Sequence, residues 1–179
     1  MSKKFISERI AKKLSRAGVC SRRLAEKMIL DRRIRVDGIV IDTPATLVND
    51  KSIIAVDRKE IASPDRERLW RLHKARGVLS TNNDPKGRPT LFQNLPGELP
   101  RVMLVGRLDF NSEGLILLTN NGELARKLEL PETGWTRRYR VRVHGELKMS
   151  KLENLEKGIT IDGIRYGPIT VKLERKQNT

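Results

Sequence analysis

The chain has 179 residues, which allow one medium domain or a small module followed by a medium one. It carries 37 lysines and arginines against 22 aspartates and glutamates, and this formal charge of +15 favours a polyanionic partner. No apolar run is long enough to span a bilayer and no signal peptide is evident, so we expect a cytoplasmic protein without a membrane span. The single cysteine and the two distant histidines predict no disulfide and no metal site.

The positive charge is concentrated in residues 9–35, which hold ten lysines and arginines and only two acids. Two short helices are predicted there, the first capped by Ser7 and the second by Ser21. A hairpin follows at residues 34–41, where an Asp-Gly pair separates two β-branched runs, and residues 53–56 form a further strand. We expect these elements to form one compact unit with an apolar side and a basic side.

This order, with Ala-Gly-Val-Cys-Ser-Arg-Arg at residues 17–23 between the helices, resembles the S4 RNA-binding fold over residues 7–57. We therefore expect an S4-like RNA-binding domain at residues 1–60. In that family the second helix and the loop before it lie against RNA. By position, the resemblance implies the following phosphate contacts: Ser21, Arg22, Arg23, Lys27 and Arg33. For each of them taken singly, a solvated surface side chain is the alternative.

The next residues, 61–68, are polar, contain a Ser-Pro pair and lack a periodic apolar face, which is typical of a linker. Beyond Leu69 the pattern mixes strands with single helices, which indicates an α+β domain on a largely antiparallel sheet. The predicted elements are strands at 69–73, 102–108, 114–119, 138–143, 159–162 and 164–174, a helical turn near 90–95, and helices after Asn121 and near 149–157.

Residues 104–120, Leu-Val-Gly-Arg-Leu-Asp-Phe-Asn-Ser-Glu-Gly-Leu-Ile-Leu-Leu-Thr-Asn, place Asp109 where an apolar run gives way to a polar turn. If the strand alternation continues through this run, Arg107 and Asp109 lie on one face, so that a cation and a carboxylate project together. The alternative is a structural role, in which the Asp109 side chain caps the turn by accepting from the amide of Asn111 or Ser112.

The stretch Gly-Arg-Leu-Asp, followed after two residues by Ser-Glu-Gly-Leu-Ile-Leu-Leu-Thr-Asn, resembles the catalytic motif of RNA pseudouridine synthases. The resemblance is to the group of these enzymes that carries an N-terminal S4 domain and modifies the RNA of the small or the large ribosomal particle. It implies isomerisation of a specific uridine to pseudouridine, with Asp109 as the essential carboxylate, ribosomal RNA as the partner and no cofactor. A carboxylate can meet the positive charge that develops at the ribose C1′, or can hold a fragment covalently.

Three further residues receive roles, Tyr139 and Lys74 from the same resemblance and Arg107 from its expected position on the strand face that it shares with Asp109. Tyr139, within Arg-Arg-Tyr-Arg-Val, matches the tyrosine that stacks on the target base and is the proposed base for the C5 proton; packing of its ring is the alternative. Arg107 would hold the carboxylate ionised or meet a phosphate, unless it is a surface arginine. Lys74, in a segment similar to the family's Asn-Lys-Pro-x-Gly loop, would line the approach of RNA.

In the family a further segment follows the point where this sequence stops, and it includes a basic motif near the catalytic aspartate. We therefore expect a partial synthase domain at residues 69–179, shortened at its C-terminal end, in which RNA binding survives better than catalysis. Two other functions remain open at this stage. One is a non-catalytic S4-type protein of ribosome assembly that binds ribosomal RNA, and the other is a protein held at a membrane surface by its basic charge. The basic surface favours a monomer.

Overall fold

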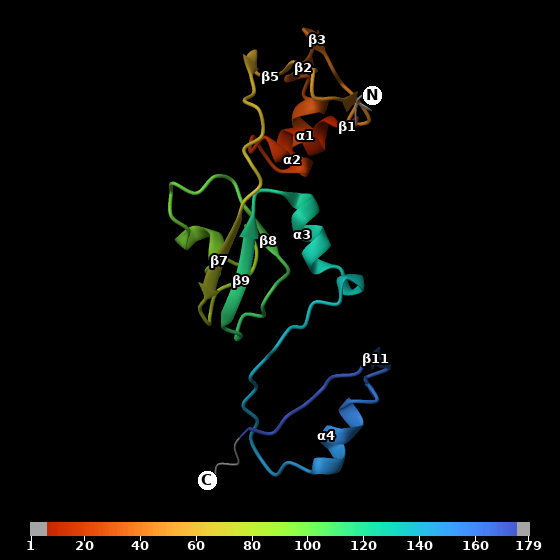
Figure 1. The fold of residues 1–179 in the computed structure, drawn as a ribbon. Coiled ribbons are helices and arrows are strands. Elements are labelled where there is room, and N and C mark those ends of the chain that lie inside the picture. Colours follow the sequence, from red (N-terminus) through yellow and green to blue (C-terminus); the bar gives the residue numbers. More distant parts are fainter. Residues whose placement is uncertain (1–6, 175–179) are drawn as a thin grey trace. The chain divides into compact units, whose positions relative to one another are not determined.

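The computed structural model describes residues 7–174, and the chain divides after Trp135 into two compact units. The first unit holds a small module of two helices and short strands, followed by a three-stranded sheet with a helix beside it (Figure 1). The second unit holds one helix and one hairpin. Among the described residues no helix is long and apolar enough to cross a membrane. The combination of helices and antiparallel strands confirms the predicted α+β class.

The N-terminal module, residues 7–60, opens with a short strand that delays the first helix. β1 (Glu8–Arg9) pairs antiparallel with β4 (Leu47–Val48), and α1 (Ile10–Arg16) begins directly after it. The residue at the N-cap of α1 is Arg9, so the predicted cap at Ser7 is wrong. The physical reason is that pairing with β4 keeps the two residues before α1 extended.

The second helix of this module begins as the sequence predicts. α2 (Arg22–Leu30) has Ser21 at its N-cap, and the Ser21 hydroxyl oxygen accepts a hydrogen bond from the Leu24 amide at 3.1 Å. This bond satisfies one of the amides that the first turn of a helix leaves without a partner.

A four-stranded antiparallel sheet completes the N-terminal module, with both of its hairpins closed by two residues of positive φ. The predicted turn at Asp37 and Gly38 has φ angles of 50° and 82°, and Asp57 and Arg58 have 48° and 68°. Two central residues of positive φ are typical of the tight hairpin turns that match strand twist. In spatial order the strands are β3 (Ile39–Val40), β2 (Ile34–Val36), β5 (Ile54–Val56) and β6 (Lys59–Glu60). The helices and sheet enclose a core that includes Ile10, Leu14, Ala25, Ile29, Ile34 and Val48.

The sheet module, residues 69–135, is built on a central strand that pairs on both sides. Its three antiparallel strands, in spatial order, are β7 (Leu69–Lys74), β9 (Gly114–Thr119) and β8 (Met103–Val105). Ile116 and Leu118 of β9 are buried against Leu91 and Val102 and form the core of this module. The sequence predicts all three strands, although β8 is shorter than the expected 102–108.

Three short elements surround this sheet. α3 (Gly122–Glu129) follows β9, and the Asn121 side chain accepts the amides of Glu123 and Leu124, as expected for its N-cap. A 3-10 turn, η1 (Leu91–Asn94), confirms the helical turn expected near 90–95. A second 3-10 turn, η2 (Pro131–Thr133), follows α3.

The segment between the two modules is held by hydrogen bonds at both of its ends. On the N-terminal side, Ile61 donates its amide to the Ile54 carbonyl at 3.0 Å and packs against the core of that module. On the other side, buried Asn120 accepts from the Arg68 amide at 2.9 Å and donates to the Arg66 carbonyl at 2.8 Å.

The second unit contains less strand than the sequence predicts. α4 (Met149–Leu155) leads into a hairpin of β10 (Ile159–Ile161) and β11 (Ile164–Tyr166), which confirms the expected helix and the two strand starts. However, residues 138–143 form no strand ladder, and the last predicted strand ends at β11 rather than at 174. Alternating apolar residues favour an extended chain, but a strand also needs a hydrogen-bonding partner, and no partner pairs with these segments among the described residues.

Candidate active site

The loop that joins β8 to β9 carries Asp109, and its path begins with a glycine. β8 ends at Val105 because Gly106 has a φ of +74°, a conformation that a glycine adopts without strain. The Gly106 amide then donates to a carboxylate oxygen of Glu129, at the end of α3, at 2.7 Å. The predicted continuation of strand alternation to Arg107 and Asp109 is therefore wrong, because the chain leaves the sheet two residues before Arg107.

Further along the loop, one serine holds the backbone of the residue before Asp109. The Ser80 hydroxyl accepts the Leu108 amide at 3.1 Å and donates to the Leu108 carbonyl at 2.7 Å. The loop that carries Ser80 is itself tied to the Asp109 loop, because the Gly77 amide donates to the Phe110 carbonyl at 2.8 Å. The two loops therefore support each other through backbone groups.

Lys74, the last residue of β7, lies beneath this loop and is 1% exposed. Its ammonium donates to the carbonyls of Asp109 at 2.9 Å, Ser112 at 2.8 Å and Ala75 at 3.1 Å. An ammonium has three N–H donors, so all of them are used. Burial lowers the pKa of Lys74, and the nearby Asp109 opposes that shift.

The expectation that Lys74 lines the approach of RNA is corrected by this geometry. A buried ammonium with three carbonyl partners has no donor left for a phosphate. The structure gives Lys74 a positioning task instead, because it joins the end of β7 to both sides of the turn at Asp109.

Asp109 itself offers an exposed carboxylate on a fixed backbone. Its main-chain carbonyl accepts the Ser112 amide at 3.0 Å, so the turn is closed by the backbone and not by the side chain. The carboxylate has no hydrogen bond or ion pair to any of the residues 7–174. The alternative in which the Asp109 side chain caps the turn is therefore wrong, because a main-chain hydrogen bond closes the turn. The carboxylate is left available for a substrate.

The neighbours of Asp109 are exposed side chains of mixed character. Arg107 is exposed and forms no ion pair within the described part of the chain. Phe110, the next residue along the loop, is an apolar side chain that is 37% exposed. On the facing loop, the Arg76 guanidinium lies 3.5 Å from the Glu113 carboxylate. A carboxylate, a guanidinium and an aromatic ring at one loop suit a ligand that is both charged and planar.

Tyr139 belongs to the second unit, where its side chain is 64% exposed. It lies in a segment outside the helices and strands, and the next residue, Arg140, pairs with Glu174 at 3.0 Å. Because the ring is not packed in a core of this unit, it is free to meet a ligand. Its role at the site remains a prediction.

The residues expected to contact phosphates in the N-terminal module fall into two groups. Arg22, Arg23 and Lys27 are exposed on α2. Arg33 instead forms a two-pronged bond with Asp57, in which Nε lies 2.8 Å from one carboxylate oxygen and Nη2 contacts the other. The Arg33 hydrogen bond lowers the pKa of Asp57, so this pair is charged at neutral pH and competes with any phosphate for Arg33.

Two residues of the site were missed by the sequence reasoning. Ser80 follows the loop that resembles the family's motif, so its position beside the site could have been inferred from that motif. Glu129 carries no such indication, because it ends a helix 23 residues from the glycine that it holds. Among residues 7–174, no group of three potential metal ligands gathers anywhere.

Comparison with known proteins identifies the family of this chain. A model of the RNA pseudouridylate synthase family matches residues 68–178, and a model of the S4 domain matches residues 8–54. The chain belongs to the RNA pseudouridylate synthases. Its S4 domain and its synthase domain follow the order that the sequence predicts.

Relatives of this synthase share much of its length. It is 49% identical over 175 residues to an uncharacterized RNA pseudouridine synthase of Rickettsia bellii, covering 96% of this chain and 74% of that relative. It is 38% identical to a ribosomal large subunit pseudouridine synthase B of Vibrio vulnificus, over 88% of this chain and 51% of the relative. A crystal structure of a pseudouridylate synthase has the same fold, with a TM-score of 0.53 at 20% identity over 89% of this chain and 70% of that one.

Proposed function

We propose that this pseudouridine synthase isomerises a uridine of ribosomal RNA in the cytoplasm, with Asp109 as the catalytic carboxylate. The proposal rests on one observation at Asp109, whose main chain is held by hydrogen bonds while its side chain has none among the described residues. Lys74, Ser80 and Ser112 fix the main chain around Asp109, while the carboxylate has no partner among residues 7–174. A rigid backbone with a free reactive group is what a preorganised catalytic residue requires. The name of the Vibrio relative supports ribosomal RNA as the substrate class.

The reaction rearranges bonds within one nucleotide. The bond between uracil N1 and ribose C1′ breaks, the base rotates, and C5 forms a new bond to C1′. The Asp109 carboxylate meets the positive charge at C1′ or forms a transient covalent bond. A base removes the proton from C5 and N1 gains one, so the product is an isomer of the substrate. The target nucleotide must leave its stack for these steps.

The other predicted residues take separate roles in the proposed reaction. Tyr139 stacks on the target base and removes the C5 proton, with Arg107 holding the carboxylate ionised or meeting a flanking phosphate. The N-terminal module anchors the RNA through Arg22, Arg23 and Lys27, with Ser21 and Arg33 at the edge of that surface. In this proposal residues 1–60 form the anchoring domain, 61–68 the linker and 69–179 the synthase domain.

The test is pseudouridine mapping of unmodified RNA from the small and the large ribosomal particles after incubation with the purified chain. We expect a new site with the parent protein and none with Asp109→Asn, while both bind RNA equally. Glu113→Gln is the matched control, because it removes another exposed carboxylate from the same loop and should keep the site. A site that persists in Asp109→Asn would reject the catalytic role. RNA binding without a site in any variant would favour a non-catalytic S4-type protein.

A further inference from the structure

A cleft of about 390 Å³ lies between the N-terminal module and the sheet module. One wall comes from α1 and α2 and the other from β8, α3 and the residues before β8. Both walls contribute cations, and the five that line the cleft are Lys12, Arg16, Arg22, Arg101 and Arg126. Only two carboxylates, Glu123 and Glu129, line it with them.

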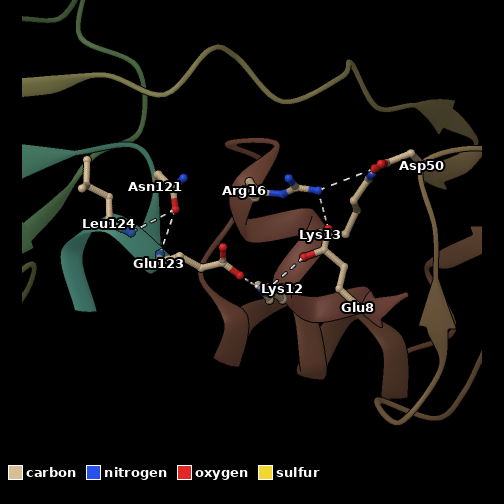
Figure 2. A network of polar contacts seen from close by, with 8 residues as sticks. All are labelled: Glu8, Lys12, Lys13, Arg16, Asp50, Asn121, Glu123 and Leu124. Atoms are coloured by element: carbon tan, nitrogen blue, oxygen red, sulfur yellow. Dashed lines mark hydrogen bonds and ion pairs between the residues drawn. The ribbon is translucent and has the colours of Figure 1, made fainter. Parts of the chain in front are cut away.

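Direct contacts between the two walls set the width of this inter-module cleft. The Lys12 ammonium of α1 binds the Glu123 carboxylate of α3, and Figure 2 shows this pair beside the cap that Asn121 makes to α3. The Arg101 guanidinium donates to the Ser15 hydroxyl at 3.3 Å. The two modules therefore meet across the cleft through polar side chains.

Both carboxylates that line the cleft already accept hydrogen bonds from other groups of the protein. Glu123 binds Lys12, whose hydrogen bond lowers the pKa of that carboxyl, and Glu129 accepts the Gly106 amide. Arg16 is likewise engaged, because it pairs with Glu8 and Asp50, as Figure 2 shows.

Three guanidinium groups remain without an ion pair among the described residues: Arg22, Arg101 and Arg126. They come from α2, from the segment before β8 and from α3, so they converge on the cleft from three elements. Arg22 reaches far across, since its Nη2 lies 3.8 Å from the position that a Cβ on Gly122 would take. Positive charge in a concave site between protein walls focuses its field on whatever enters.

We propose that the inter-module cleft binds the phosphodiester backbone of RNA, so that one strand contacts both modules at once. The proposal rests on the proposed function, which makes RNA the ligand. Guanidinium groups bind phosphate oxygens through paired, charge-assisted hydrogen bonds, and three of them converge here. The volume of the cleft falls in the range that holds small organic groups, which suits a ribose and its phosphate. Two further cations of α2, Arg23 and Lys27, are exposed outside the cleft.

The experiment measures the salt dependence of binding to a short RNA hairpin of arbitrary sequence, since backbone contacts are independent of sequence. Arg101→Gln/Arg126→Gln removes two charges from the sheet-module wall and leaves the surface of the N-terminal module intact. Lys127→Gln/Lys59→Gln is the control, because it removes two exposed charges that do not line the cleft. Thermal melting of each variant confirms that it is folded.

We expect the slope of log K against log salt to fall by about 1.4 to 1.8 in the cleft variant, the value for two lost phosphate contacts, and to stay at the parental value in the control. Equal slopes in all three proteins would overturn the proposal, and so would an equal loss in the cleft variant and the control. Pseudouridine mapping on the same preparations separates this outcome from the proposed function. A parent that modifies RNA while the cleft variant keeps its slope refutes the cleft alone. If the cleft variant has the reduced salt slope but the parent forms no pseudouridine, RNA binding in the cleft is supported and the proposed function is refuted.

Discussion

Replacement of Lys74 by methionine tests whether a buried ammonium holds the loop that carries Asp109. Methionine keeps the length of the side chain but donates no hydrogen bond, so the carbonyls of Ala75, Asp109 and Ser112 all lose a partner. Hydrogen bonds to a charged group each contribute about 1.5 to 3 kcal/mol. The burial of the charge in the parent offsets much of that sum, so we expect a net loss of about 3 kcal/mol in the free energy of unfolding.

The assay for this change is urea unfolding followed by tryptophan fluorescence, because half-buried Trp70 lies on β7 with Lys74. Lys127→Met is the matched control, since it makes the same replacement on the exposed face of α3. Pseudouridine formation should also fall by roughly a hundredfold, as expected when a reacting group moves by about 1 Å. If Lys74→Met unfolds within about 0.5 kcal/mol of the parent, the range of ordinary surface substitutions, the positioning role is refuted.

Two further predictions concern single side chains elsewhere. The Arg88 side chain lowers the pKa of Asp84 to about 2, so the stability from this pair is complete above the ordinary carboxyl value of 3.8 and is lost as the pH falls towards 2. Thermal melting between pH 2 and 5 should therefore depend less on pH in Asp84→Asn, and an unchanged dependence would contradict the pairing. Ser21→Ala should cost about 1 kcal/mol of stability through loss of the α2 cap, whereas Ser21→Asp keeps the cap. If Ser21 also faces RNA, Ser21→Asp should weaken RNA binding at parental stability, which a filter-binding titration beside urea unfolding would show.

Local sequence patterns predicted the parts of the fold that depend on local interactions. The Ser21 and Asn121 caps, the Asp37-Gly38 turn and the strands β7 and β9 were all foreseen, because capping groups, turn residues and apolar runs act over a few residues. The start of α1 was missed because it depends on pairing between β1 and β4, which lie far apart in the sequence.

The candidate site shows the same division between local and distant interactions. The motif identified the loop of Asp109, but nothing near Lys74 indicated that its ammonium would be buried under three carbonyls from two loops. Arg33 was grouped with the surface cations, since its partner Asp57 lies 24 residues away on a neighbouring hairpin. The strand expected at 138–143 illustrates a third case, because alternation predicts an extended backbone without specifying the partner that completes a ladder.

The fastened linker limits how far the anchoring domain can reach. Ile61 is held by the N-terminal module and Arg66 by Asn120, so only residues 62–65 span the gap without these attachments. Four residues extend over at most roughly 14 Å. In the proposed function, an RNA bound by the N-terminal module therefore meets the Asp109 loop as part of the same complex, at an effective concentration on the order of millimolar. On that proposal, the short linker restricts modification to uridines that lie within a limited distance of the bound phosphates.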